Sequence, residues 1–163
     1  MQSYWLSYKN IDMENREIIS DLKGLIAIVN DGKEGYHSAA ESTDNVELKA
    51  VFLKYVAQRA LYENELKSHI AAHGGESTND DGGILGAIHR TWIDIKEALT
   101  DKSETAVLGA VITGENAALD KYDSAIEENK LHADHLNLLT AHRNGIAEAL
   151  KEIEVLQQKY KDK

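Results

Sequence analysis

Apolar residues recur at helical spacing through most of the chain, and the sequence does not break the pattern into short segments. The 163 residues include no proline, so long helices can form without the kinks that proline imposes. Intervals of three and four residues place side chains on one face of a helix, which is then buried against other helices. The pattern predicts four long helices, at about residues 15–42, 46–73, 103–129 and 131–160.

The connections between these helices predict the topology. The first two helices and the last two are each joined by only a few residues, so each pair forms an antiparallel hairpin. The segment between the hairpins contains a shorter apolar stripe at 84–99, which predicts a fifth helix, and it is long enough to return along the whole bundle. One long crossover between two hairpins is the ferritin-like arrangement. We therefore predict an all-α, ferritin-like four-helix bundle as a single domain over residues 15–160.

Residues 1–14 precede this predicted domain as an N-terminal extension. We expect either an upstream start or a loosely docked segment, with Trp5 and Tyr8 as its only anchors. A short internal repeat supports the hairpin pairs, because residues 36–41 (Tyr-His-Ser-Ala-Ala-Glu) resemble residues 122–127 (Tyr-Asp-Ser-Ala-Ile-Glu). Both segments lie toward the end of the first helix of a predicted hairpin, although chance similarity between long helices is an alternative.

The charge balance limits the classes of partner. The formal net charge is −10 at pH 7, which disfavours nucleic acid and anionic membranes because both select clustered Lys and Arg. The sequence lacks an apolar run of the roughly 20 residues that a membrane-spanning helix needs. It also lacks the pattern of a secretory signal and contains no cysteine. We expect a cytoplasmic protein, and the motifs identify no catalytic residue.

Several polar residues take inward positions on the predicted stripes, which raises the hypothesis of a metal site. Ferritin-like bundles hold metal with a Glu from each of two helices and a Glu-x-x-His from each of the other two. Here the one Glu-x-x-His, Glu34 with His37, points to the flank of its helix. The inward residues that remain have carboxylate and imidazole groups, which suit iron, manganese or zinc. This reduced set is Glu63, Glu115, His135 and His142.

A buried polar network is the alternative, and we favour it. Lys33 and Arg59 share the inward stripes and could neutralise the two carboxylates, because a buried charge needs a partner. Two cations at these positions oppose a cage for a divalent metal. His69 and His73, spaced i, i+4, with Glu65 one turn earlier, could form a surface metal site, and His132 and His135 have the related i, i+3 spacing. Histidines near a helix C-terminus more commonly suit the helix dipole.

Several short motifs occur in a specific order along the chain. They are Asp31-Gly32 with Ala39-Ala40-Glu41, Glu47-Leu48-Lys49 before Phe52, Gln58-Arg59 with Glu65-Leu66, Gly74-Gly75, Gly86 with His89-Arg90, Trp92 and Lys96, and Gly114-Glu115 with Tyr122. In these motifs and their order, the chain resembles an uncharacterised bacterial group of ferritin-like proteins, which is known only as a domain of unknown function. The resemblance covers about residues 15–157 and implies a ferritin-superfamily bundle without a known activity. It draws attention to Glu41, Arg59, Glu65, Glu115 and His142.

Three functions are consistent with these observations. The leading hypothesis is a non-catalytic structural or stress-associated protein that acts through association, as a dimer formed by helix faces left free in the bundle. The alternative is a divalent-metal protein or di-iron-type oxidase, with Glu63, Glu115 and His142 among its ligands. A weaker third hypothesis is an adaptor that presents the crossover helix, with His89 and Trp92, to a partner.

Overall fold

The structure is a computed structural model, and it describes residues 2–76, 95, 97, 99, 103–128 and 133–163. Within these residues the regular structure is entirely helical, which confirms the prediction of an all-α fold. The four long helices of the described residues are α1 (Gln2–Ser42), α2 (Val46–Ala72), α4 (Glu104–Glu128) and α5 (Ala133–Lys161).

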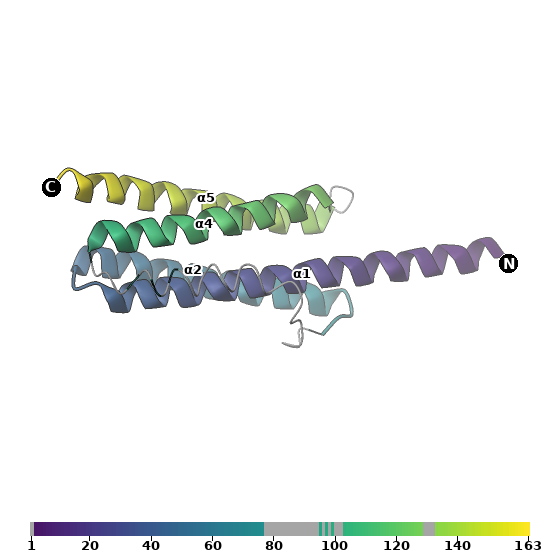
Figure 1. Cartoon of the computed structure of the whole chain (residues 1–163). Coiled ribbons are helices and arrows are strands. Elements are labelled where there is room, and N and C mark those ends of the chain that lie inside the picture. Colours follow the sequence, from purple (N-terminus) through teal and green to yellow (C-terminus); the bar gives the residue numbers. More distant parts are fainter. Residues whose placement is uncertain (1, 77–94, 96, 98, 100–102, 129–132) are drawn as a thin grey trace.

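The helices lie side by side as two antiparallel hairpins (Figure 1). α1 packs along α2, and α4 packs along α5, while α1 also contacts α4 across the two hairpins. α2 ends at the opposite end of this bundle from the end at which α4 begins, so these two helices run in the same direction (Figure 1). The end of α2 therefore lies at the same end of the bundle as the beginning of α5.

Local sequence signals explain where α2 begins and ends. The Asn45 side chain caps its first turn, because the Oδ1 atom accepts a hydrogen bond from the Leu48 backbone nitrogen at 3.1 Å. The Asn45 Nδ2 atom also donates to Glu104 Oε1 and Tyr160 Oη, each at 2.8 Å, which joins this corner to α4 and α5. Beyond the other end of α2, Gly74 has a φ angle of +79°, a left-handed conformation that glycine adopts readily.

The predicted apolar stripes form the core between the helices. Burying these side chains is the main favourable contribution to folding, at about 1.5–3 kcal/mol for each large apolar side chain. Tyr36 of α1 and Tyr122 of α4, the first residues of the two repeated segments, are both fully buried. The other fully or almost fully buried large side chains are Leu22, Leu48, Phe52, Arg59, Leu66, Ile70, Leu108, Leu139, Ile146 and Ile153.

The N-terminal segment differs from the sequence prediction. α1 begins at Gln2 and runs without a break through residues 2–14, whereas the predicted helix starts at about residue 15. Its N-terminal part projects beyond the other helices (Figure 1). Trp5 and Tyr8 are 73% and 74% exposed, so they do not anchor this segment to the bundle. The continuous helix has a simple cause, since no glycine or proline precedes Gly24 in the sequence.

The predicted crossover helix at 84–99 falls mostly outside the described residues. His89, Arg90 and Trp92, and with them the adaptor hypothesis, lie in the part that the structure does not describe. Ile95 and Leu99 are described, and both are buried, as their places on the predicted stripe require. No helix in the described part of the chain combines the length and the apolar composition that a membrane span requires.

Candidate functional site

A buried ion pair joins the two hairpins near the middle of the bundle. Arg59 of α2 donates from Nη1 to Glu115 Oε1 at 2.7 Å and from Nη2 to Glu115 Oε2 at 2.6 Å. The two side chains are 1% and 0% exposed. The parallel pair of hydrogen bonds matches the planar guanidinium to the carboxylate. Each charge is therefore compensated by the other, as a buried charge requires.

Residues of α1 shape the pocket that holds Arg59. A Cβ atom added at Gly32 would lie 3.1 Å from Arg59 Nη1, so the glycine leaves room for the guanidinium group. The guanidinium carbon lies 5.5 Å from the centre of the Tyr36 ring, which permits a cation–π contact. Burial raises the pKa of Tyr36 well above its ordinary value, and the Glu115 charge adds to this effect. Tyr36 is therefore a neutral phenol beside the ion pair.

A second, less buried ion group lies between α1 and α2. Lys33 donates to Glu63 Oε2 at 2.7 Å, and Lys67 donates to Glu63 Oε1 at 2.9 Å. Burial alone would raise the pKa of Glu63, but the two lysines outweigh burial and bring that pKa below its ordinary value. Glu63 is therefore an ionised carboxylate with two cationic partners.

His142 of α5 is at the centre of a third polar group. Its Nδ1 atom lies 3.1 Å from Tyr122 Oη, and its Nε2 atom lies 3.1 Å from Glu65 Oε2. The Tyr62 ring stacks on the imidazole, with ring centres 4.0 Å apart. Burial lowers the pKa of His142, although Glu65 opposes that effect. These contacts fit a neutral imidazole that donates from Nε2 to Glu65 and accepts at Nδ1 from Tyr122.

Gly145, one turn after His142, makes room for the stacked tyrosine. A Cβ atom added at Gly145 would lie 1.8 Å from Tyr62 Oη and 3.1 Å from Tyr62 Cζ. Any larger residue at this position would therefore displace the Tyr62 side chain from its present place. The glycine serves close packing between α2 and α5, which is a common reason for glycine within a helix.

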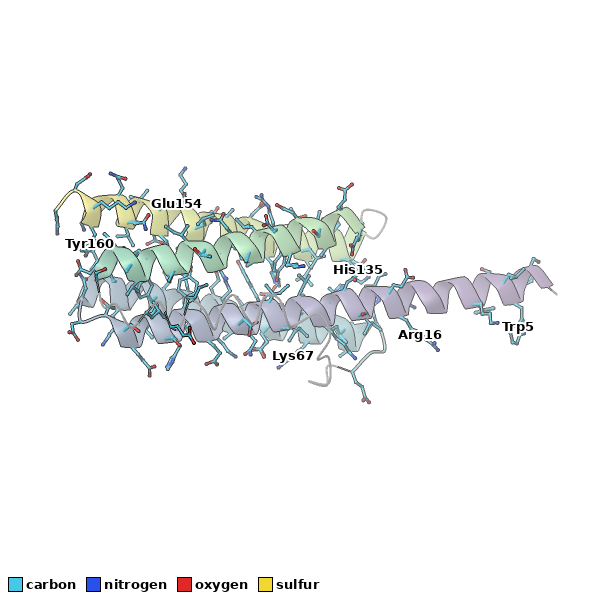
Figure 2. All side chains as sticks on the ribbon, in the orientation of Figure 1. Trp5, Arg16, Lys67, His135, Glu154 and Tyr160 are labelled. Carbon is cyan, nitrogen blue, oxygen red and sulfur yellow. The ribbon has the colours of Figure 1, made fainter. Side chains whose placement is uncertain are left out.

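Four potential metal ligands gather where α2 ends and α5 begins, and we call them the end cluster: His69, His73, Asp134 and His135. One ligand atom of each lies within 4.8 Å of the corresponding atoms of the other three. His73 Nε2 lies 3.1 Å from Asp134 Oδ2, and His69 Nε2 lies 3.9 Å from the same oxygen. His69 Nε2 also contacts His135 Nδ1 directly. Figure 2 shows His135 at this end of the bundle.

The structure distributes the four predicted metal ligands among different groups. Glu115 pairs with Arg59 and Glu63 pairs with Lys33, which are the two cations that the polar-network hypothesis named. Lys67, which that hypothesis did not include, also pairs with Glu63. His142 lies with Tyr122 and Glu65, whereas His135 belongs to the end cluster. Within the described residues, the end cluster is the only group of three or more His, Cys, Asp or Glu side chains whose ligand atoms converge in this way.

The periodicity of the helices did not place Glu65, Lys67 or Asp134 in these groups. Glu65 falls on the flank of α2 by helical periodicity, although the resemblance drew attention to it, and its side chain nevertheless reaches His142. Asp134 received no attention, because its partners come from a helix far away in the sequence. Glu41, also singled out by the resemblance, is exposed on α1, where its Oε2 atom lies 3.8 Å from His37 Nδ1.

The sequence profile of the family described as a domain of unknown function, DUF2383, matches residues 17–128. This span is more than half of the chain. The chain belongs to the DUF2383 family. The matched span of this DUF2383 protein includes most of α1 and all of α2 and α4, and so contains both Arg59 and Glu115. It ends before α5, which contributes His142 and half of the end cluster. Comparison with curated proteins gives no match.

Proposed function

We propose that this DUF2383 protein is a ferritin-like four-helix bundle that acts through association and not through catalysis. The proposed active form is a homodimer, and the proposed location is the cytoplasm. The observation that carries this proposal is the projecting part of α1, whose large apolar side chains are mostly exposed in the described part of the chain. Tyr4, Trp5, Leu6 and Tyr8 are 74%, 73%, 63% and 74% exposed.

A concentrated group of exposed apolar side chains marks an interaction surface more often than chance exposure does. These four residues occupy five successive positions of one helix, and Figure 2 shows Trp5 at the end of the chain that lies farthest from the other helices. Tyr4 and Tyr8 are spaced i, i+4, and Trp5 and Tyr8 are spaced i, i+3, so they share one face of α1. That face is suited to covering by another helix.

The exposed face continues the face of α1 that is buried in the bundle. The residues on this face follow one another at intervals of four, seven, three and four, which is the spacing of the a and d positions of a coiled coil. They are Tyr4, Tyr8, Asn15, Ile18 and Leu22. Ile18 and Leu22 are buried in the core. Among the described residues, the same stripe is therefore buried in one part of α1 and exposed in the projecting part.

A second copy of the chain is the partner that best fits this stripe. A symmetric dimer would bring the same apolar face of two α1 helices together, since a two-fold interface uses one surface twice. Lys9 is the only charged residue within residues 2–9. The projecting segments can therefore approach each other with little repulsion, although the whole chain has a formal net charge of −10.

The middle of the bundle supports a role without catalysis. Arg59 already occupies both oxygens of Glu115, and two lysines occupy Glu63. A di-iron-type oxidase with Glu63, Glu115 and His142 as ligands, the alternative function, would have to release these cations from the carboxylates first. Breaking one buried pair costs about 3–5 kcal/mol, so we place the oxidase second.

Light scattering coupled to size-exclusion chromatography tests the proposal. We expect the wild-type chain to be a dimer and the Trp5→Glu/Tyr8→Glu variant to be a monomer, because burial of each aromatic side chain contributes about 1.5–3 kcal/mol. Val155→Glu is the matched control: Val155 is also exposed, at 63%, but lies on α5, and we expect its variant to remain a dimer. A wild-type monomer at every concentration, or a dimer unchanged by the double substitution, would contradict the proposal.

A further inference from the structure

We propose that the end cluster binds one divalent transition-metal ion, of which Zn²⁺ is the best example, and that the ion links the end of α2 to the beginning of α5. This inference is independent of the proposed association, because its residues lie on the bundle and not on the projecting part of α1. It also differs from the central set that the sequence suggested, with which it shares only His135.

The ligand types suit this class of metal. The end cluster offers three imidazoles and one carboxylate, and Zn²⁺ prefers four nitrogen, sulfur or oxygen ligands in a tetrahedral arrangement. Imidazole also binds Co²⁺, Ni²⁺ and Cu²⁺, whereas Mg²⁺ and Ca²⁺ prefer sites made of oxygen atoms alone. Nitrogen atoms therefore favour a transition metal over the alkaline-earth ions.

The distances are already close to those of a metal shell. Metal–ligand bonds of about 2.0–2.2 Å in a tetrahedron place neighbouring ligand atoms about 3.3–3.6 Å apart. His73 Nε2 and Asp134 Oδ2 are 3.1 Å apart, and His69 Nε2 and Asp134 Oδ2 are 3.9 Å apart. All four ligand atoms lie within 4.8 Å of one another. The four atoms are therefore near the spacing that ligands of one ion require.

The backbone positions the ligands in pairs. His69 and His73 are four residues apart near the end of α2, so their side chains project from one face of the helix. Asp134 and His135 are adjacent in the first turn of α5. The negative end of the α2 dipole favours a cation at this place, and the Asp134 carboxylate offsets the positive end of α5.

The four ligands differ in how far they are buried, from the buried His135 to the exposed Asp134. His135 is 2% exposed and is therefore held in a fixed place by its surroundings. The side chains of His69 and His73 are 18% and 28% exposed, and that of Asp134 is 60% exposed. Solvent thus reaches three of the four ligand side chains, which gives an ion a path of entry.

Binding of the metal would stabilise the contact between the two hairpins. His69 and His73 belong to the first hairpin, and Asp134 and His135 belong to the second. An ion that binds only the folded chain stabilises it in proportion to the logarithm of its concentration above Kd. We therefore expect Zn²⁺ to raise the unfolding temperature of the wild-type chain.

The test uses the full chain without a histidine tag, freed of metal with a chelator and titrated with Zn²⁺ in competition with a chromogenic chelator. We expect one ion per chain and a rise in unfolding temperature. The variants His73→Ala and Asp134→Asn should each weaken binding at least about 100-fold, since loss of an outer-shell partner alone costs about 10–100-fold. Bound Co²⁺ should give the intense visible absorption of a tetrahedral site.

His37→Ala is the matched control, because His37 and Glu41 form an exposed i, i+4 pair on α1 away from the end cluster. We expect its affinity for Zn²⁺ to equal that of the wild-type chain. Circular dichroism shows whether each variant is folded. The test uses the partly exposed His73 and the exposed Asp134, because replacing the buried His135 would also perturb the core. No binding of Zn²⁺ by the wild-type chain, or equal binding by folded His73→Ala and Asp134→Asn variants, would overturn the proposal.

Discussion

Two polar groups connect the same pair of hairpins, one in the middle of the bundle and one at its end. In the middle, Arg59 of α2 and Glu115 of α4 form a buried pair in which each charge has its partner. At the end, three imidazoles from α2 and α5 converge with the Asp134 carboxylate. The carboxylates in the middle pair with cationic side chains, whereas the ligand atoms of the end cluster gather within 4.8 Å of one another. The difference lies in the charge of the neighbouring side chains, which are Arg59 and two lysines in the middle.

The largest expected effect concerns the ion pair in the middle. Arg59→Met leaves the Glu115 carboxylate buried without its partner, and we expect it to lower the free energy of unfolding by about 3–5 kcal/mol. Replacing both residues, as Arg59→Met/Glu115→Leu, should recover most of the lost free energy of unfolding, because no unpaired charge remains. Urea unfolding at neutral pH measures both values. A loss below about 1 kcal/mol in the single variant would show that solvent reaches the pair and that the middle is not closed.

The next largest effect concerns the packing around His142, which belongs to neither of these two groups. Gly145→Ala places a Cβ atom 1.8 Å from the present position of Tyr62 Oη. We expect a loss of about 1–3 kcal/mol in the free energy of unfolding, as for other overpacked sites. Adding Tyr62→Phe should recover part of it, because the clashing oxygen is then absent.

Gly109→Ala is the control for that experiment. An added Cβ atom at Gly109 meets only the end of the Gln157 side chain, at 3.1 Å from Nε2, which can move aside. We expect this variant to be unchanged or to gain up to about 1 kcal/mol, because alanine favours the helix over glycine. Equal losses in Gly109→Ala and Gly145→Ala would show that Tyr62 does not restrict α5.

A smaller effect should depend on pH. Burial lowers the pKa of His142 below its ordinary value of about 6.5. The unfolded chain therefore takes up this proton first as the pH falls, so the contribution of His142 to stability is present above about pH 6.5 and is lost below it. We expect His142→Gln to reduce the dependence of the unfolding free energy on pH between 7 and 5 by at most about 1.4 kcal/mol per pH unit. An unchanged pH dependence in the variant would contradict a neutral, buried His142.

The smallest effect concerns the partly exposed pair of Lys33 and Glu63. Lys33→Gln should lower the free energy of unfolding by less than about 1 kcal/mol, because Lys67 still neutralises Glu63 and solvent screens the contact. Added salt should reduce the difference between the variant and the wild-type chain. A loss as large as that of Arg59→Met would show that burial does not distinguish the two ion pairs.

Much of the fold could be predicted because the signals are local. The beginning of α2 follows from the Asn45 cap, and its end follows from Gly74, so the predicted range 46–73 differs little from the observed helix. The beginning of α1 was predicted poorly. Polar residues between Lys9 and Arg16 interrupt the apolar stripe, so its continuation to Tyr4 and Tyr8 is difficult to recognise. The helix nevertheless continues, because no glycine or proline ends it there.

The candidate site could be predicted only in part. Neutralisation of Glu63 and Glu115 by Lys33 and Arg59 was predicted, because a buried charge needs a partner, but the prediction did not say which cation pairs with which carboxylate. The spacing of His69 and His73 was visible, but two histidines near a helix end are common. Their meeting with Asp134 and His135 depends on the directions of α2 and α5 in three dimensions, which the periodicity of neither helix reveals.

The most direct test of the central claim, that any metal binds at the end of the bundle and not in its middle, is to follow the histidine rings during a titration with Zn²⁺. Long-range ¹H–¹⁵N spectra resolve the two nitrogens of each imidazole. We predict that the signals of His69, His73 and His135 change together and stop changing at one ion per chain, while those of His142 stay in place. A change at His142 without a change at the other three, or no change at any of them, would contradict the claim.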